Sequence, residues 1–144
     1  MKTEFQKFQA YLRSRDLKMT RTRGLIFKEI FCSPAVHPNA YDIHRRLRAK
    51  RKDISLATIY RTLNLLVKSG LVSEIDLGED HSHYEPEWNK IAHGHLICLS
   101  CGKVQEFSNK EVQEVIDRIG QEKGYTLDKF SIQVFGFCQA CKKS

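Results

Sequence analysis

The sequence predicts an α+β protein of two parts: a helical part that ends in a β-hairpin over residues 1–85, and a small α/β part over residues 86–144. Three observations predict this division. Apolar residues recur at helical spacing before Gly70, polar and apolar residues alternate directly after it, and both Cys-x-x-Cys motifs lie in the second part. With 144 residues, 41% of them hydrophobic, the chain is long enough for two small domains with hydrophobic cores.

Three helices are expected in the first fifty residues. The first covers residues 4–16, whose apolar side chains fall on one helical face. The second can be capped by Thr20 or Thr22, because a hydroxyl accepts a hydrogen bond from a free backbone N–H of the first turn, and it ends before Pro34. Asn39 can cap the third helix in the same way.

The fourth helix has the clearest signal, in the stretch SLATIYRTLNLLVKSG. Ser55 can cap its beginning, and Gly70 can end it in the left-handed conformation that glycine adopts without strain. Its apolar stripe is expected to be buried and consists of Leu56, Ile59, Leu63, Leu66 and Val67. The opposite face carries polar and hydrogen-bonding side chains.

A period of two residues after Gly70 predicts strands. LVSEIDL and HSHYE, joined by the turn GED, form a hairpin that ends at Pro86, and residues 86–92 form a connection. The second part is then expected to contain strands over 93–98 and 103–107, a helix capped by Ser108 that runs to about residue 123, and a last strand over 126–137.

Helices followed by a hairpin are typical of a winged helix-turn-helix domain, with the fourth helix as recognition helix and the hairpin as wing. Residues 1–68 carry 16 Lys and Arg against 5 Asp and Glu, a net charge of +11, whereas residues 69–144 carry 8 against 12, a net of −4. A basic first part predicts binding to double-stranded DNA. The candidate DNA-binding residues are Lys18, Arg21, Arg23, Thr58, Tyr60, Arg61 and Asn64. The competing interpretations are a solvated basic surface and, for Tyr60, a partly buried core tyrosine.

Two Cys-x-x-Cys motifs predict a metal site. The start of the chain lacks the apolar stretch of a signal peptide, and no apolar run is long enough to cross a membrane, so we expect a cytoplasmic protein with reduced cysteines. Tetrahedral Zn²⁺ needs two thiolate pairs, which Cys98, Cys101, Cys138 and Cys141 supply. A redox-active motif is the alternative. Cys32 is left over and is expected to be buried at the end of an apolar helix.

Strand parity separates the histidines from the cysteines. Residues two apart share a face of a strand, so His93 and His95 point to one side and Cys98 to the other. A second metal site of imidazoles and carboxylates follows, suited to Fe²⁺, Mn²⁺ or Zn²⁺. Its further candidate ligands are His37, Glu85 and Glu106. A lone histidine such as His37 is more often a surface or capping residue, and His44, His81 and His83 are expected at the surface.

The chain resembles the ferric uptake regulator family over nearly its whole length. The resemblance is carried by LKMTRTR, HPNAYDI, ISLATIYRTLNLLVKSGLV, HYE, HGHLICLSCGKVQEF and GFCQAC. It implies a homodimeric winged-helix repressor with a C-terminal dimerisation domain, a structural zinc on the four cysteines, and a sensing metal on His37, Glu85, His93, His95 and Glu106. It also implies DNA contacts by Tyr60, Arg61, Lys18 and Arg23, and no enzymatic activity.

Within the family, the residue types favour a repressor that senses Fe²⁺ and controls iron-uptake genes, with Mn²⁺ or Zn²⁺ able to substitute. Peroxide-sensing members typically have Asp at the positions of Glu85 and Glu106, and zinc-sensing members bring an extra cysteine into the site; both remain alternatives, and a metallohydrolase is a remote one. Many iron sensors have His-His-Asp-His at the positions where this chain has Ala92-His93-Gly94-His95. The further metal site that those positions supply in such relatives is therefore expected to be missing here. Glu87 competes with Glu85 as ligand, and dimer or tetramer is left open.

Overall fold

The computed structural model describes residues 2–32, 37–87 and 93–142. The chain divides into two compact units, Met1–Trp88 and Asn89–Ser144, which are called the N-terminal unit and the C-terminal unit below. Ala92 lies outside the described residues. None of the described helices combines the length and the apolar character that a membrane crossing requires.

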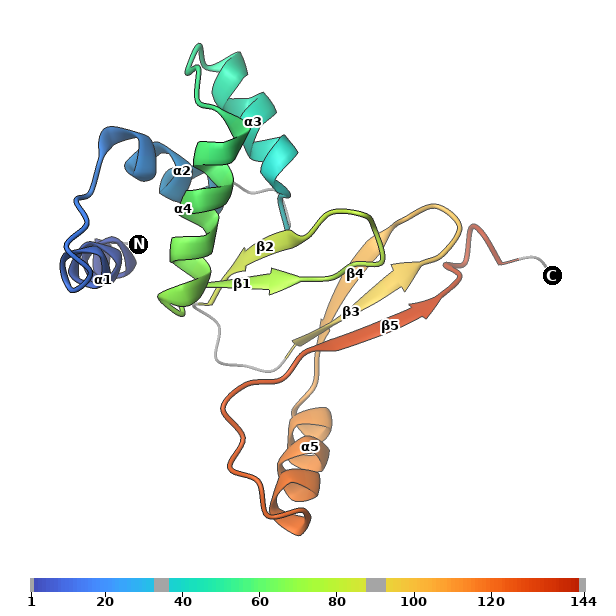
Figure 1. Ribbon diagram of the computed structural model, residues 1–144. Coiled ribbons are helices and arrows are strands. Elements are labelled where there is room, and N and C mark those ends of the chain that lie inside the picture. Colours follow the sequence, from blue (N-terminus) through green and yellow to red (C-terminus); the bar gives the residue numbers. More distant parts are fainter. Residues whose placement is uncertain (1, 33–36, 88–92, 143–144) are drawn as a thin grey trace. The chain divides into compact units, whose positions relative to one another are not determined.

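The N-terminal unit consists of four helices and a hairpin, as the hydrophobic periods predict (Figure 1). Thr20, Asn39 and Ser55 cap the second, third and fourth helices, each by accepting a hydrogen bond from a first-turn N–H. The first helix begins two residues earlier and ends three residues earlier than predicted, because the chain turns at Ser14–Asp16. The elements are α1 (Lys2–Arg13), α2 (Arg21–Phe31), α3 (Ala40–Ala49), α4 (Leu56–Lys68), β1 (Val72–Ile75) and β2 (His83–Pro86).

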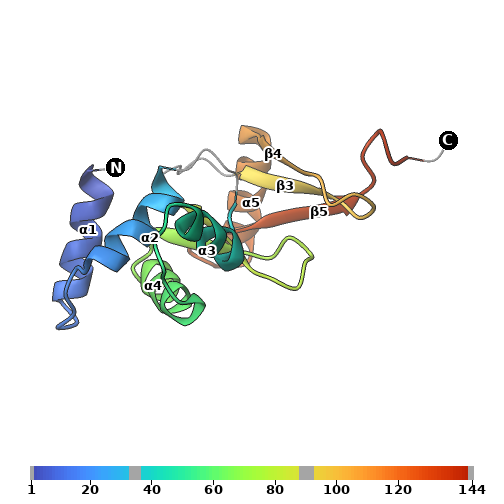
Figure 2. The ribbon, with the colours of Figure 1, turned by 90° about the horizontal axis from the view of Figure 1, so that it is seen from above.

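The core of the N-terminal unit is built around the aromatic face of α2. Phe27 stacks on Phe31 with ring centroids 4.2 Å apart, and Phe5 of α1 meets Phe27 edge-on at 5.2 Å. Figure 2 shows α1 on the outer side of α2, with α3 and α4 on its other side. Of the predicted stripe of α4, Ile59, Leu63 and Leu66 are buried in this core, and the partly buried Leu56 and Val67 pack against it. Each such side chain contributes about 1.5–3 kcal/mol by leaving water, so α4 is firmly held and its polar face is left outside.

The C-terminal unit is a three-stranded sheet with one helix: β3 (His93–Cys98), β4 (Val104–Ser108), α5 (Lys110–Glu122) and β5 (Ile132–Gly136). The strand order is β4-β3-β5, with β4 antiparallel and β5 parallel to β3 (Figure 1). Two boundaries predicted from sequence are wrong. Ser108 pairs with His93 as the last residue of β4, so Asn109 caps α5 in its place, and the last strand is limited to its five residues that pair with β3.

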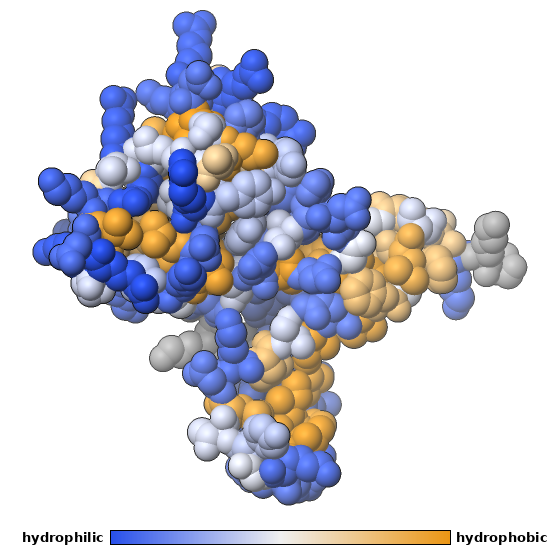
Figure 3. Space-filling model, in the orientation of Figure 1, coloured by the Kyte–Doolittle hydropathy of each residue, from blue (hydrophilic) through white to orange (hydrophobic). Residues whose placement is uncertain are grey.

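Hydrophobic side chains are far more exposed on the C-terminal unit than on the N-terminal unit, and the apolar colouring of Figure 3 shows this over α5 and the sheet. Ile119 of α5 is 50% exposed, and Phe135 of β5 is 46% exposed. The apolar side chains that are exposed on this unit are Leu96, Leu99, Val115, Ile119, Tyr125, Leu127, Val134, Phe135 and Phe137. So large an apolar surface is typical of a contact with another protein chain.

Candidate metal centres and nucleic-acid interface

The four cysteines of the two Cys-x-x-Cys motifs come together at one end of the C-terminal sheet. Cys98 is the last residue of β3 and Cys101 lies in the turn that follows, whereas Cys138 and Cys141 lie in the turn after β5. The parallel register between β3 and β5 aligns Cys98 with Gly136, and Leu99 N–H donates to the Gly136 carbonyl at 2.8 Å. Strand pairing therefore brings together two motifs that are far apart in sequence.

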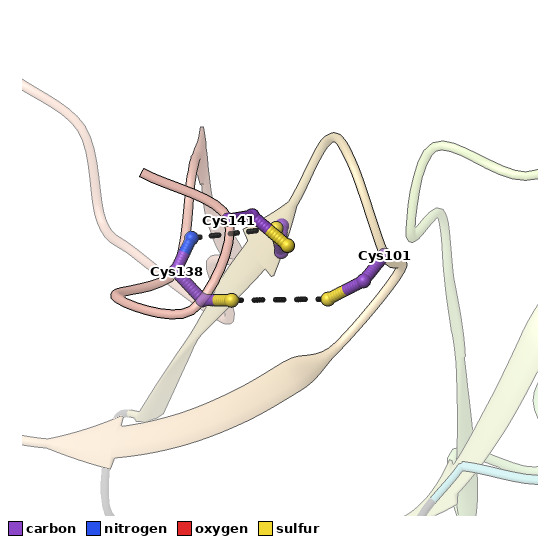
Figure 4. Close-up of side chains that lie close together, drawn as sticks. Cys101, Cys138 and Cys141 are labelled. Carbon is purple, nitrogen blue, oxygen red and sulfur yellow. Dashed lines mark hydrogen bonds between the residues drawn. The ribbon is translucent and has the colours of Figure 1, made fainter. Parts of the chain in front are cut away.

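The sulfur geometry fits a tetrahedral ion. The four Sγ atoms lie within 4.8 Å of one another, and Sγ of Cys101 is 3.8 Å from Sγ of Cys138 (Figure 4). A Zn–S bond of about 2.3 Å in tetrahedral geometry sets neighbouring sulfurs about 3.8 Å apart. Four thiols without oxygen or nitrogen competitors are the donor set that Zn²⁺ prefers in closed sites. The cluster thus satisfies the predicted pairing of the two motifs.

Backbone hydrogen bonding prepares this cluster for a cation. The N–H of Cys138 donates to Sγ of Cys98 at 3.3 Å. This bond is the main reason that the pKa of Cys98 falls to about 6, and N–H groups of Cys101 and Ser100 add to it. At Cys141, a hydrogen bond with Ser100 is outweighed by the neighbouring thiols, which raise the pKa to about 11. Cys98 therefore forms its thiolate at lower pH than Cys141 does, and a bound cation would favour loss of the Cys141 proton.

Cys32 does not belong to this cluster, and the prediction that it is buried is wrong. It is the C-cap residue of α2, and its side chain is exposed. The apolar face of α2 ends at Phe31, one residue too early to include Cys32.

His37 and Glu85 are joined by a hydrogen bond in the N-terminal unit. His37 Nε2 lies 2.8 Å from Oε2 of Glu85, and the His37 side chain is only 3% exposed. His37 stands two residues before the α3 N-cap with a φ of +57°, the left-handed region that few non-glycine residues adopt. Glu87 lies further along the chain, where its N–H donates to the Leu71 carbonyl at 2.9 Å. Of the two candidate glutamates, Glu85 is therefore the one beside His37.

His93, His95 and Glu106 lie together in the C-terminal unit. The rings of His93 and His95 have centroids 5.3 Å apart, so both imidazoles lie on one face of β3, as parity predicts. Glu106 is the β4 residue in register with His95, and its Oε1 lies 3.9 Å from His95 Nε2. Two imidazoles and a carboxylate on neighbouring strands can supply three donors to a borderline divalent ion.

Gly94 is enclosed by an aromatic ring. It is in register with Phe107, and a β-carbon at Gly94 would stand 2.6 Å from Cε1 of that ring. A phenylalanine that covers a cross-strand glycine is a known way to fill the space the missing side chain leaves. An aspartate at Gly94 would not fit unless Phe107 moved. The packing thus gives a steric reason for the departure from His-His-Asp-His.

The prediction that His83 is a surface residue is wrong. Its side chain is buried at the start of β2, where Nδ1 donates to the backbone carbonyl of His37 at 2.6 Å and Nε2 lies 2.7 Å from Oε2 of Glu79. The parity used for His93 and His95 would have found it, since His83 and Glu85 are two apart in one strand. His81 is exposed as predicted and packs its ring on Tyr41, with centroids 4.7 Å apart. His44 is half-buried on α3.

The polar face of α4 carries the residues proposed to read bases. Tyr60 is 40% exposed and Arg61 and Asn64 are also exposed, so Tyr60 is not a core tyrosine. Burial and Tyr41 nevertheless raise the pKa of its phenol, which remains neutral. Thr58 accepts a hydrogen bond from Arg61 Nη2 at 3.3 Å and forms another with the Ser55 cap, which orients both side chains. Tyr60, Arg61 and Asn64 border a shallow groove that Val67, Glu74 and Tyr84 also line.

Basic residues surround the entry to α2. Lys18 and Arg21 are exposed, and the guanidinium of Arg23 donates to the Lys18 carbonyl and so holds this segment against the helix. Free N–H groups at the α2 N-terminus and cations beside it suit a phosphate. The N-terminal unit thus offers a polar helix face and basic side chains, the two kinds of contact that DNA binding combines.

Comparison with known proteins gives one consistent result. Residues 14–135 match the model of the "Ferric uptake regulator family". The ferric uptake regulation protein of Synechococcus elongatus is 37% identical over 94% of this chain and 93% of its own length. The peroxide operon regulator of Bacillus subtilis is 31% identical over 92% of this chain and 89% of its own. The ferric uptake regulator of Pseudomonas aeruginosa, solved with manganese, has 28% identity and a TM-score of 0.79 over 90% of this chain and 96% of that one.

Proposed function

Because the chain belongs to the ferric uptake regulator family, we propose that it is a repressor that binds DNA when Fe²⁺ is present and so controls iron-uptake genes. The single observation that carries the proposal is the pair of incomplete donor sets, one in each unit. His37 and Glu85 are two ligands in the N-terminal unit, and His93, His95 and Glu106 are three in the C-terminal unit. Each set has fewer ligands than an ion in a protein site requires, and both sets consist of imidazole nitrogens and carboxylate oxygens.

We infer that one ion takes ligands from both sets. His93 follows Glu85 by eight positions, a chain that can span about 27 Å when extended. The tether therefore allows the two sets to meet. Nitrogen and carboxylate donors suit Fe²⁺, and the family member solved with manganese supports Mn²⁺ as its substitute. When bound, the ion supplies attraction between the units, and the free energy of that attraction shifts the population toward one domain arrangement.

A second, permanent ion has a different role. We assign Zn²⁺ to Cys98, Cys101, Cys138 and Cys141, whose thiols fit it in number, spacing and softness. Closed thiolate sites of this kind contribute directly to folding. Here the ion would join the turn after β3 to the turn after β5. The zinc is thus expected to stabilise the C-terminal unit and not to report on metal supply.

The repressor is proposed to act as a homodimer. The argument is the apolar surface of the C-terminal unit, where β5 is an edge strand and its Val134 and Phe135 are exposed. A twofold dimer matches a palindromic operator, because each copy of α4 reads one half-site. A fixed arrangement of domains is then needed to set α4 of both copies at the spacing of successive major grooves.

Peroxide sensing by the same ligands is the alternative, which the similarity to the Bacillus subtilis peroxide operon regulator supplies. Glutamate at positions 85 and 106 favours iron sensing, because the family pattern implies aspartate at these positions in peroxide sensors. A peroxide sensor would oxidise a ligand histidine on exposure of the Fe²⁺-loaded protein to peroxide. Mass spectrometry of the tryptic peptides that contain His37, His93 and His95 separates the two functions.

The proposal is tested by His93→Ala in gel shifts on an operator fragment at graded Mn²⁺ or anaerobic Fe²⁺. Loss of one imidazole donor is expected to move the midpoint to about 10-fold higher metal or beyond. His44→Ala, on α3 and outside both donor sets, is the matched control and should leave the midpoint unchanged. The same metal dependence in wild type and His93→Ala would overturn the proposal.

A further inference from the structure

We propose that His83 is a positioning residue that joins the metal ligand His37 to the wing, so that an ion held by His37 and Glu85 also orders the wing. The wing loop is defined as residues 76–82, between β1 and β2, and the ligand segment as residues 37–39. The inference rests on the proposed function, in which His37 and Glu85 bind metal and the N-terminal unit binds DNA. It concerns the N-terminal unit alone.

The ligand segment is attached to the hairpin as a short third strand. Asn39 forms an antiparallel bridge with His83, and the Tyr84 N–H donates to the Pro38 carbonyl at 3.0 Å. In Figure 1 the chain that enters α3 lies beside β2. A shift of the ligand segment therefore reaches β2 directly through backbone hydrogen bonds.

The imidazole of His83 adds a side-chain bond to the His37 backbone, with Nδ1–H donating to the carbonyl oxygen at 2.6 Å. His83 is 8% exposed, so water cannot readily replace this donor. His37 adopts the left-handed conformation, which costs a non-glycine residue free energy and persists only where the surrounding structure holds it. The bond thus fixes the backbone from which the His37 ring extends toward Glu85.

The other edge of the His83 ring meets the wing loop. Nε2 lies 2.7 Å from Oε2 of Glu79, whose side chain is 52% exposed. One ring therefore contacts the ligand segment on one side and the wing loop on the other. Because the Glu79 contact is solvated, it is the weaker of the two, and the buried bond to the carbonyl is the contact on which the position of His83 depends.

Strand β2 closes the connection. Glu85 lies two residues beyond His83 on the same face of β2. Its Oε2 lies 2.8 Å from Nε2 of the His37 ring. An ion that takes ligands from His37 and Glu85 restrains both the ligand segment and β2, and His83 passes that restraint to Glu79 and the wing loop. The coupling works in both directions, so a wing held by DNA favours the metal-binding arrangement of His37.

Three variants of the full-length, zinc-retaining protein test this, with Mn²⁺ as the probe. His83→Ala removes both contacts. His83→Asn keeps a donor near the position of Nδ1 and loses the contact with Glu79. The matched control is His81→Ala. His81 is a histidine of the wing loop, and its ring packs on Tyr41. For each variant, calorimetry gives the Mn²⁺ affinity, gel shifts give the DNA affinity with and without Mn²⁺, and hydrogen exchange gives the protection of residues 76–82.

In the wild type, Mn²⁺ should slow amide exchange in the wing loop and tighten DNA binding. His83→Ala should lose the Mn²⁺-dependent protection and about 10-fold of the Mn²⁺ effect on DNA affinity. His83→Asn should recover most of the Mn²⁺ effect on DNA affinity. His81→Ala should behave as wild type in both wing-loop protection and DNA affinity. Recovery by Asn is a result that general destabilisation of the unit would not produce.

Wild-type protection of residues 76–82 by Mn²⁺ in His83→Ala would overturn the inference, and so would an Asn variant as impaired as the Ala variant. Both results leave the proposed function intact, since the wild type still responds to Mn²⁺. A wild-type protein whose DNA binding ignores Mn²⁺ and Fe²⁺ would instead overturn the proposed function, and the inference with it.

Discussion

The ring of Phe107 occupies the space next to Gly94 in which a side chain would have to lie, since a β-carbon at Gly94 would stand 2.6 Å from Cε1. The two residues face each other across β3 and β4, and Gly94 stands between the candidate ligands His93 and His95. Glycine at position 94, where many iron sensors have aspartate, and the Phe107 ring that covers it are therefore parts of one packing feature.

Gly94→Ala is expected to destabilise the protein by about 1–3 kcal/mol, because the added methyl group overpacks against Phe107. Chemical denaturation of the zinc-loaded protein measures it. Gly136→Ala is the matched control, as a β-carbon there meets nothing within 4 Å, and it should be nearly neutral. The steric account fails if the two variants are equally stable, and Gly94→Ala with Phe107→Leu should recover part of the loss.

Cys98→Ser is expected to lose the tightly held zinc and to unfold or monomerise the protein. Removing one of four thiolates opens a closed site, and the folding free energy that metal binding supplies is lost with it. Zinc content after gel filtration and the sedimentation of the product check both effects. Cys32→Ser is the control, because this exposed thiol lies outside the cluster, and it should retain one zinc per chain. A folded, dimeric Cys98→Ser protein would contradict a structural role.

The stability of the metal-free protein should depend on pH through the cysteine cluster. The pKa of Cys98 is about 6 when folded, against 9.0 for a free thiol, so its thiolate stabilises the fold fully above pH 9 and loses this effect as pH falls to about 6. The pKa of Cys141 is about 11, so its contribution has the opposite sign and declines from pH 9 to 11. Denaturation midpoints from pH 5.5 to 11 should therefore rise toward pH 9 and fall above it. A wild-type, metal-free profile that stays flat between pH 6 and 9 would remove Cys98 as the cause.

Arg61→Ala is expected to weaken binding to the operator by about 1–3 kcal/mol, the range for losing a paired contact to a guanine edge. Arg61 is exposed on α4 and oriented by Thr58, so no core contact is lost with it. Fluorescence anisotropy with the operator and with a base-substituted operator measures both affinity and specificity. Lys68→Ala, in the last turn of the same helix, is the control for charge alone. Equal losses for both variants would mean that Arg61 acts through charge and not through base contact.

Short-range patterns were predicted well because local chemistry decides them. Ser55 and Asn39 cap their helices, since a side-chain oxygen next to free N–H groups acts within one turn. Period-two alternation placed His93 and His95 on one face of β3. The pairing of the two Cys-x-x-Cys motifs followed from what Zn²⁺ requires, although the β3–β5 register that aligns them was not visible.

The sequence by itself therefore determined the fold class and the order of the elements, and it indicated the candidate metal ligands, because these depend mainly on patterns among residues a few positions apart. Tertiary structure alone decided burial and long-range partners. It placed His83 under the His37 carbonyl, left Cys32 exposed, gave the α5 cap to Asn109, and set Phe107 over Gly94. These outcomes depend on which atoms approach from elsewhere in the chain. Strand parity could have indicated the inward face of His83, but no local period or motif encodes which atom it meets there.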